Sequence, residues 1–217
     1  MFRVDYNNFK KKYIEQPFVI VAGNVGAGKS TYTEILSNNL NLKSHYEKVD
    51  GNPYLEDFYN NQTMWGFHLQ LYFLTQRYEQ QREIDASNTS NIQDRSIFED
   101  AEIFARNLYD IGKMSERDFQ VYMSVYKSMI PSLKKPDLMI YLDGSIETII
   151  NRIKLRGREI EQSTDIEYWI SLHKKYEQWI KEYTHSPVLY VNIDKVDLVK
   201  YPEHIEPLCE EIRKILY

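Results

Sequence analysis

The sequence predicts an α/β fold, in which a five-stranded parallel sheet is flanked by helices. Five short segments of strand character alternate with segments of helical periodicity, the order typical of parallel strands joined by helical crossovers. The apolar, β-branched run 17–22 also leads into a glycine-rich loop and then a helix. At 217 residues the chain is long enough to bury a sizeable core, so we expect a single domain, 1–217.

The strands are expected where short apolar runs meet turn signals. Asp50-Gly51-Asn52-Pro53 breaks the chain after the second strand, and Pro131 and Pro136 separate a helix from the fourth. The expected strands are 17–22, 43–49, 88–93, 137–143 and 188–193.

The helices are expected between these strands. The longest, 63–86, has no proline and only Gly66 as an internal glycine, and Gly157 is placed to end a later one. The expected helices are 30–40, 54–60, 63–86, 99–109, 115–130, 145–155, 166–183 and 204–216. Aromatic residues at helical spacing in 166–183 are interpreted as packing rather than as a nucleic-acid stacking surface: Tyr168, Trp169, Tyr176 and Trp179.

The glycine-rich loop fits the phosphate-loop pattern of glycine, four residues, then Gly-Lys-Ser. Its glycines allow a tight turn, so that backbone N–H groups and a helix N-terminus face the phosphates of a nucleotide. Lys29 is predicted to reach the β- and γ-phosphates, and the Ser30 hydroxyl to bind Mg²⁺. The residues predicted to bind ATP are Gly23, Asn24, Val25, Gly26, Ala27, Gly28, Lys29, Ser30 and Thr31.

Composition restricts the partners and the compartment. The formal net charge of −5 gives no overall basic field for nucleic acid or an anionic membrane. Cys209 is the only cysteine, which suits a reducing compartment. The charged first sixteen residues leave no apolar run for a signal peptide, and no later run has membrane-spanning length. We therefore expect a soluble, cytoplasmic protein that acts on small molecules.

Charged side chains follow the second and third strands. Because the carboxyl ends of parallel strands meet at one edge of the sheet, Glu47, Asp94 and Arg95 are expected beside the phosphate loop. A hydroxyl acceptor of the γ-phosphoryl needs a carboxylate, whereas a monophosphate needs arginine. Glu47 has no arginine near it in sequence, which favours a hydroxyl. Asp94 is a candidate ligand of Mg²⁺, and Arg95 is a candidate to hold Glu47 in place. Alternatively, the triplet Asp94-Arg95-Ser96 forms only a surface ion pair or a helix cap.

An arginine-rich segment follows the fourth strand. Arg152 and Arg156 are i,i+4 neighbours, and Gly157 frees Arg158 from the helix. Arginines that close over the transferring phosphoryl stabilise its charge, so 152–163 is predicted to be a lid. A solvated basic helix end is the alternative.

One stripe of the long helix mixes apolar and polar residues. Phe67, Gln70, Leu74 and Arg77 share a face, and a buried amide and guanidinium need partners. Gln70 is suited to pair with a purine edge, and Arg77 with Asp100. An internal Arg77–Asp100 bridge without a ligand is the alternative.

Together these motifs resemble the deoxyribonucleoside kinase family over nearly the whole chain. The resemblance implies a P-loop kinase fold, with Glu47 as general base for the 5′-hydroxyl and Arg95 beside it. It also implies that Lys29 and the lid arginines act on the phosphoryl group, and that Ser30 and Asp94 attend Mg²⁺. The residues that it implies for the sugar and the base are Tyr59, Glu161, Gln70, Arg77 and Asp100.

The resemblance also implies a substrate and an assembly. A charged Arg77–Asp100 pair should exclude thymidine and favour deoxyadenosine, with deoxyguanosine and deoxycytidine open. Family members are dimers through two helices, here expected to be the long helix and the one after Ser96. Two positions differ from the usual family pattern. A proline usually follows the catalytic Glu, whereas this chain has Lys48 there, and many members have Glu where this chain has Asp94.

Two other readings stay open at this point. A thymidylate-type monophosphate kinase shares the phosphate loop, an Asp-Arg pair and a lid, but needs an arginine near Glu47. A non-catalytic P-loop switch needs a guanine-reading Asn-Lys-x-Asp motif, which we do not find.

Overall fold

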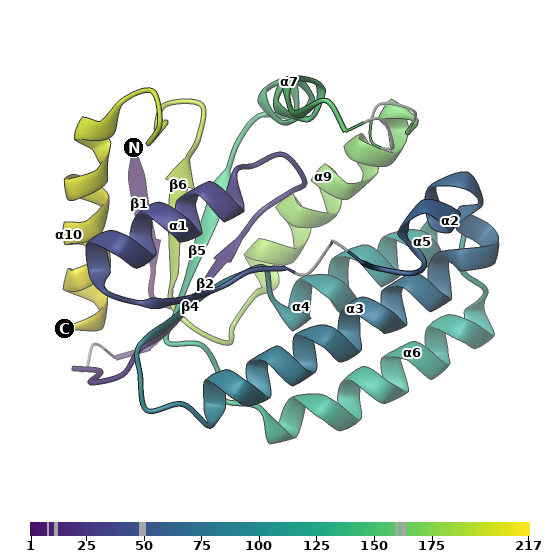
Figure 1. Cartoon of the computed structure of the whole chain (residues 1–217), viewed down its shortest axis with the longest axis horizontal. Coiled ribbons are helices and arrows are strands. Elements are labelled where there is room, and N and C mark those ends of the chain that lie inside the picture. The colour runs from purple at the N-terminus through teal and green to yellow at the C-terminus, as the bar shows by residue number, and fades with distance from the viewer. Residues whose placement is uncertain (8, 11–12, 48–50, 159–160, 162–163) are drawn as a thin grey trace.

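The structure is a computed structural model, and it describes residues 1–7, 9–10, 13–47, 51–158, 161 and 164–217. Its centre is a six-stranded sheet in the order β1-β6-β5-β2-β4-β3 (Figure 1). Five of these strands run parallel, as predicted. They are β2 (Phe18–Ala22), β3 (Lys43–His45), β4 (Asn91–Asp94), β5 (Leu138–Asp143) and β6 (Val188–Asn192).

The sixth strand was not predicted. β1 (Phe2–Asp5) pairs antiparallel with β6 at the edge of the sheet, and Arg3 lies over the Tyr190 ring, 3.8 Å from its centroid. An edge strand has one neighbour and an exposed face, so it needs no continuous apolar run. From the sequence we noted only that the first sixteen residues are charged and contain no apolar run.

The helices match the predicted order, with small shifts at their ends. Residues 48 and 49 of the predicted second strand lie outside the described residues. The observed helices are α1 (Lys29–Leu40), α2 (Leu55–Asn60), α3 (Gln62–Asp85), α4 (Ile97–Glu99), α5 (Arg106–Asp110), α6 (Glu116–Met129), α7 (Ile146–Arg156), α9 (Ile166–Glu182) and α10 (Ile205–Leu216).

The predicted helix 99–109 is more complex than expected. It starts earlier, at Ile97, with Ser96 as its cap, and its middle is the π-helical segment η1 (Asp100–Ala105). A π-helical turn inserts an extra residue and commonly marks a functional site. Here it begins at Asp100, one of the predicted site residues.

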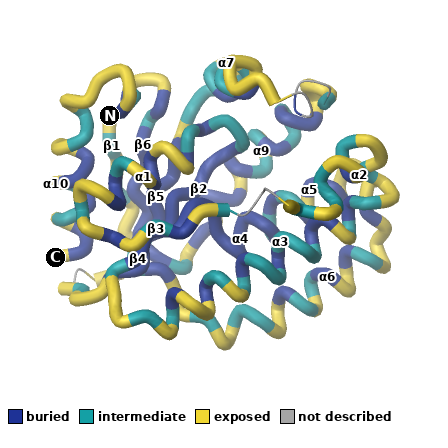
Figure 2. The backbone as a smooth tube through the Cα atoms, viewed as in Figure 1, coloured by how far each residue is buried: buried dark blue, intermediate teal, exposed yellow. Residues whose placement is uncertain are grey.

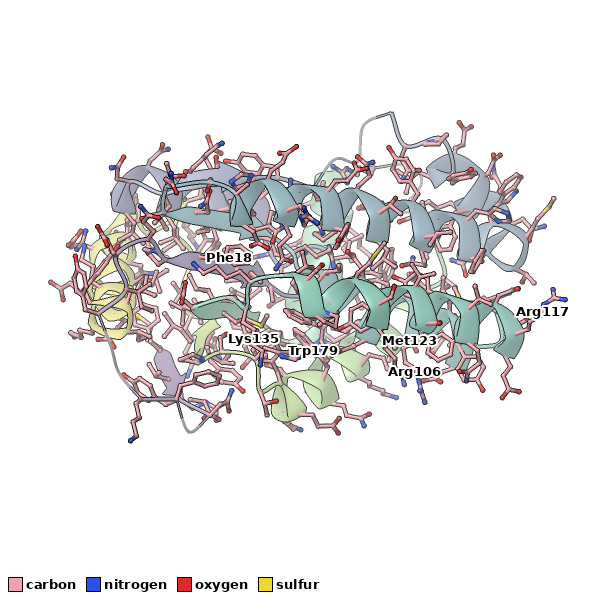
Figure 3. All side chains as sticks on the ribbon, turned by 90° about the horizontal axis from the view of Figure 1, so that it is seen from below. Phe18, Arg106, Arg117, Met123, Lys135 and Trp179 are labelled. Atoms are coloured by element: carbon pink, nitrogen blue, oxygen red, sulfur yellow. The ribbon has the colours of Figure 1, made fainter. Side chains whose placement is uncertain are left out.

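The sheet is the centre of the core. Almost every residue of β2, β4, β5 and β6 is buried, as the dark blue strands of Figure 2 show. α1 packs against β2, β3 and β4 and against α10, while η1 packs against α3, α6 and α9. α3 and α6 lie side by side along one edge of the molecule (Figures 1 and 3). Burial on both faces explains why β2, β5 and β6 are almost continuously apolar, whereas β4 is buried although three of its four residues are polar.

Candidate active site

One large cavity, of about 950 Å³, opens at the carboxyl edge of the sheet. Its walls come from the phosphate loop, from α2, α3 and η1, and from α7 and α9. Most of the predicted site residues line it: Val25, Gly26, Gly28, Lys29, Ser30, Thr31, Glu47, Tyr59, Gln70, Asp94, Arg95, Asp100, Arg152, Arg156, Arg158 and Glu161. The residues of the prediction that do not line it are Gly23, Asn24, Ala27 and Arg77. A cavity of this size can hold a nucleotide-sized ligand.

The phosphate loop depends on glycine conformations. Gly26 has φ +81° and Gly28 has φ +94°, both in the left-handed region that other residues adopt at a cost. α1 begins directly after Gly28, so its free N–H groups face the cavity. A Cβ on Gly26 would lie 2.8 Å from Ile153 Cγ1, which shows how closely the loop approaches α7.

Lys29 lies inside the loop. Its ammonium group donates hydrogen bonds to the carbonyl oxygens of Gly23, at 3.0 Å, and Asn24, at 2.9 Å. Burial, reinforced by the positive charge of Arg95, lowers the pKa of Lys29 to about 8. An incoming anion would reverse this effect, because a nearby negative charge favours the protonated amine.

Ser30 and Asp94 lie together where α1 starts and β4 ends. The Ser30 hydroxyl donates to Asp94 Oδ2 at 2.5 Å. Asp94 Oδ1 is buried and has no hydrogen-bond partner among the described residues. A buried carboxylate oxygen without a partner is costly, and oxygen ligands of this kind are what Mg²⁺ prefers. These residues therefore fit a magnesium ion.

Glu47 is held by two arginines from different parts of the chain. Arg77 Nη2, on α3, donates to Glu47 Oε1 at 2.8 Å, and Arg95 Nε, after β4, lies 3.0 Å from the same oxygen. Burial alone would raise the pKa of Glu47, but Arg95, Arg77 and Lys29 outweigh it and hold the pKa at about 2. The carboxylate is therefore charged at neutral pH. We predicted the contact with Arg95 and missed the one with Arg77.

Arg95 has an unusual backbone. Its φ of +68° is rare for a residue with a side chain, and its N–H donates to the Val21 carbonyl at 3.0 Å. Its guanidinium lies over the Phe104 ring, 4.4 Å from the centroid. Left-handed strain of this kind concentrates at functional sites, where the surrounding contacts hold it in place. The strain here turns the guanidinium from the end of β4 toward Glu47.

The predicted Arg77–Asp100 pair is present. Arg77 Nε donates to Asp100 Oδ2 at 3.2 Å, and Arg77 Nη1 donates to the Asp94 carbonyl at 2.9 Å. With Glu47 as its third partner, the buried guanidinium contacts protein on each nitrogen. Asp100 lines the cavity, and burial raises its pKa to about 6 although Arg77 opposes this. Asp100 thus faces the cavity, whereas Arg77 lies behind it.

Gln70 is the polar group of α3 that faces the cavity. It is buried, with 3% exposure, and among the described residues nothing forms a hydrogen bond with its amide. A buried amide without a protein partner is destabilising unless a ligand or water satisfies it. Gln70 is therefore placed to recognise a ligand.

The lid arginines divide into two groups. Arg152 donates to the Ala27 carbonyl at 2.9 Å and lies 3.6 Å from Asp197 Oδ2, so it contacts the phosphate loop. Arg156 Nε donates to Glu161 Oε2 at 3.0 Å, and Arg158 Nη1 lies 3.5 Å from Glu161 Oε1. Gly157, with φ +70°, ends α7 as predicted. Residues 159, 160, 162 and 163 of the predicted lid lie outside the described residues.

Tyr59 lines the same cavity as the lid arginines and Glu161. Burial, together with the charge of Glu161, raises the pKa of Tyr59 to about 12, so the phenol remains protonated at neutral pH. Glu161 is 5% exposed. A phenol donor and a buried carboxylate acceptor thus lie on the side of the cavity near the lid.

Comparison with known protein families identifies the family of this chain. A model of the deoxynucleoside kinase family matches residues 19–217. The chain belongs to the deoxynucleoside kinase family. It is 42% identical to the deoxyadenosine/deoxycytidine kinase of Bacillus subtilis over 211 residues, which cover 96% of this chain and 97% of that one. It is 36% identical to the deoxyadenosine kinase of Dictyostelium discoideum, over 95% of this chain and 84% of that one.

Solved structures agree with this assignment. A deoxyadenosine kinase from M. mycoides, solved with dCMP and dCDP as products, has a TM-score of 0.81 and 32% identity. The match covers 91% of this chain and 100% of that one. This deoxynucleoside kinase is therefore an ATP-dependent phosphotransferase. The lack of an arginine near Glu47 in sequence does not exclude a monophosphate kinase, because Arg77 and Arg95 both contact Glu47 in the structure. The family match is what leaves the monophosphate kinase and the non-catalytic switch unsupported. No helix in the described part of the kinase is long and apolar enough to cross a membrane.

Sequence reasoning missed several residues that shape the site of this kinase. Tyr168 and Trp169 line the cavity, and Tyr176 contacts Arg95, although we interpreted all three as packing. Phe104 and Glu99 contact Arg95 as well. The periodicity of 166–183 identified the buried face of α9, but no local signal showed that part of this face borders a cavity.

Proposed function

We propose that this kinase transfers the γ-phosphoryl group of ATP to the 5′-hydroxyl of a purine deoxynucleoside, deoxyadenosine foremost, in nucleotide salvage. The observation that carries the proposal is the Glu47 carboxylate, held ionised by Arg77 and Arg95 on the wall of the cavity that the phosphate loop also lines. A charged acceptor oxygen beside a phosphate site suits a hydroxyl and repels a monophosphate.

Glu47 acts as the base in this proposal. An ionised carboxylate accepts a hydrogen bond from the 5′-hydroxyl and takes its proton as the new P–O bond forms. Because the transition state of phosphoryl transfer is loose, little proton transfer is needed early, so a carboxylate with a low pKa suffices. Arg95 holds the carboxylate and stabilises the charge that develops on the acceptor oxygen.

The donor side is the phosphate loop, residues 23–30, together with Thr31 after it. Its N–H groups bind the phosphates, and Lys29 exchanges its carbonyl partners for phosphate oxygens. Arg152, which contacts the loop, adds its guanidinium to the phosphate site. Arg156 and Arg158 stabilise the transferring phosphoryl group once their ion pairs with Glu161 break. Ser30 and Asp94 would hold Mg²⁺, which neutralises phosphate charge when bound.

The remaining cavity residues recognise the nucleoside. Tyr59 and Glu161 would hold the 3′-hydroxyl, a donor and an acceptor for one hydroxyl group. Gln70 and Asp100 would contact the base edge, with Arg77 fixing Asp100 from behind. A site built of buried polar groups rejects a base that leaves them unpaired, so thymidine is disfavoured.

The relatives include kinases named for adenine, cytosine and guanine nucleosides. The Bacillus subtilis protein is named for deoxyadenosine and deoxycytidine, and the M. mycoides kinase was solved with dCMP and also with dATP bound. Adenine and cytosine share an amino group next to a ring nitrogen acceptor, a pattern that one Gln amide can pair with. Deoxycytidine is therefore the second candidate, ahead of deoxyguanosine.

We also propose a cytoplasmic homodimer. The segment expected to pair after Ser96, Ile97–Asp110, is largely buried within the chain and offers little surface. α6 lies beside α3 instead, and Met64 and Val121 on these helices are 61% and 51% exposed. We therefore place the dimer face on α3 and α6; sedimentation of the purified chain would test it.

The test of the proposed function is Glu47→Gln, assayed by ADP release with ATP, Mg²⁺ and deoxyadenosine. We expect kcat to fall about 100-fold or more, because the amide cannot accept the proton, while ATP binding is unchanged. The control is Glu83→Gln, an exposed glutamate of α3 that should leave kcat unchanged. Near wild-type turnover by Glu47→Gln would show that Glu47 is not the base.

A substrate panel tests the base preference. Deoxyadenosine should give the highest kcat/KM, followed by deoxycytidine and deoxyguanosine, with thymidine lowest. Turnover of deoxythymidine monophosphate in place of any nucleoside would instead support a monophosphate kinase.

A further inference from the structure

Glu99 is a fully buried carboxylate that the proposed mechanism does not use. It is 0% exposed and lies in the first turn of α4, where it forms a capping box with Ser96. Its Oε2 accepts hydrogen bonds from the Ser96 backbone N–H, at 2.8 Å, and from the Ser96 hydroxyl, at 2.9 Å. A capping box needs only one carboxylate oxygen. The second oxygen is free for another task.

That second oxygen joins two distant segments. Glu99 Oε1 accepts a hydrogen bond from the N–H of Gly23, at 3.2 Å, and another from the Tyr176 hydroxyl of α9, at 2.8 Å. Gly23 is the first residue of the phosphate loop, and its carbonyl accepts from Lys29. Glu99 therefore connects the donor side of the site to α9.

Tyr176 carries the connection onward to the acceptor side. Its hydroxyl accepts a hydrogen bond from Arg95 Nη1 at 2.8 Å while it donates to Glu99. Arg95 Nη1 also lies 3.8 Å from Glu99 Oε1, and Arg95 Nε lies 3.0 Å from Glu47. The buried contacts thus run without a gap from the phosphate loop through Glu99, Tyr176 and Arg95 to Glu47.

We propose that Glu99 and Tyr176 are positioning residues, which hold the Arg95 guanidinium against Glu47 and tie it to the phosphate loop. This inference rests on the proposed role of Glu47 as the base. Arg95 starts from a strained backbone and has a flexible side chain, so fixed partners are needed to keep one geometry. The Phe104 ring restrains the plane of the guanidinium, and the Tyr176 hydroxyl fixes its rotation within that plane.

The donors around Glu99 require a carboxylate. Among the described residues, two N–H groups and two hydroxyls donate hydrogen bonds to Glu99, and a carboxylate group suits them because both of its oxygens accept. A glutamine in its place would turn an NH₂ group toward N–H donors on one side. The negative charge also balances Arg95, which is 5% exposed.

The central experiment is Tyr176→Phe, which removes one hydroxyl and keeps the ring. We expect kcat to fall about 10- to 100-fold, the range for loss of a buried hydrogen bond to a charged group, with KM for ATP changed less than about 2-fold. The matched control is Tyr183→Phe, at the end of the same helix: Tyr183 is also buried, but its hydroxyl pairs with Ser186. This control should retain kcat at a similar melting temperature.

A double-mutant cycle separates positioning from a general structural effect. In an Arg95→Lys background, Tyr176→Phe should cost less than about 2-fold in kcat, since its partner is already gone. Glu99→Gln, which keeps one acceptor for the helix cap, should lower kcat about 10-fold in the wild-type background and little in Arg95→Lys. Equal losses in both backgrounds, or a Tyr176→Phe variant as active as Tyr183→Phe, would overturn the inference.

Glu47→Gln in the same assay keeps this inference distinct from the proposed function. If Glu47→Gln is inactive while Tyr176→Phe and Glu99→Gln are fully active, the proposed positioning role is wrong and the proposed base is not affected. If Glu47→Gln remains active, the proposed base is wrong whatever the other variants do.

Discussion

The phosphate loop and the carboxylate cluster around Glu47 line the same cavity but are held by different means. The loop is eight consecutive residues, 23–30, whose shape comes from glycine backbone conformations and the start of α1. The cluster is built from side chains far apart in sequence: Glu47, Arg77, Arg95 and Asp100. The phosphate loop therefore depends on local backbone geometry, and the carboxylate cluster, which we propose binds the acceptor, depends on long-range ion pairs.

This difference predicts where stability and activity reside. Arg77 links three chain segments, and its removal takes the arginine partner from Asp100 and leaves Glu47 with Arg95 alone. Among the described residues, Lys29 donates hydrogen bonds only to carbonyls of its own loop, and burial lowers the pKa of its amine, so the fold does not stabilise its charge. The same change of a cation to methionine should thus act differently on the two sides.

Arg77→Met should produce the largest effect on stability. Removing one partner of a buried ion network costs about 3 to 5 kcal/mol, which corresponds to a fall in Tm of about 10 °C for a chain of this size. Differential scanning calorimetry without ligand would measure it. A Tm within about 2 °C of wild type would contradict the view that ion pairs hold the acceptor side.

Lys29→Met is the matched change on the donor side. We expect the free energy of unfolding to change by less than about 1 kcal/mol, since no ion pair is lost. Turnover should fall about 100-fold or more, because the transferring phosphoryl loses a positive charge. Urea unfolding and ADP release would measure the two quantities, and a large loss of stability would contradict the proposed division.

The pH dependence of stability should identify Glu47 as the charged centre of the cluster. Its folded-state pKa of about 2 lies below the ordinary value of 4.5, so its stabilisation is complete above pH 4.5 and is lost as the pH falls toward 2. The full contribution is on the order of 3 kcal/mol. The difference in unfolding free energy between wild type and Glu47→Gln should therefore shrink from pH 5 to pH 3. Urea titrations would measure this difference, with Glu83→Gln as control; a constant difference would refute it.

Gly26→Ala should have a modest effect on stability and a selective effect on ATP binding. Gly26 and Gly112 both have left-handed backbones, with φ +81° and +72°, so alanine at either costs about 1 to 2 kcal/mol. Only at Gly26 would the new Cβ meet other atoms, Ile153 Cγ1 at 2.8 Å and the Ile149 carbonyl at 3.1 Å. KM for ATP should rise in Gly26→Ala and not in Gly112→Ala. Equal KM values would show that the loop tolerates displacement from α7.

The sequence predicted the elements that local chemistry determines. The phosphate loop, the Gly157 end of α7 and the buried face of α3 all follow from spacing within one segment. The Arg77–Asp100 pair was also predicted correctly, because a buried guanidinium on an apolar stripe requires a partner. Strand β1 was missed, since an exposed edge strand of four residues carries almost no apolar signal.

The sequence by itself determined that this chain carries a phosphate loop and belongs with nucleotide-binding α/β proteins, and it predicted that Glu47 and Arg95 lie beside that loop. Only the tertiary structure decided that Arg77 and Arg95 both hold Glu47, and that Glu99 and Tyr176 connect them to the phosphate loop. The physical reason is the range of the interactions. Backbone conformation and helical periodicity act within a few residues and leave a pattern in the sequence, whereas contacts between side chains 30 to 81 positions apart exist only once the sheet has assembled.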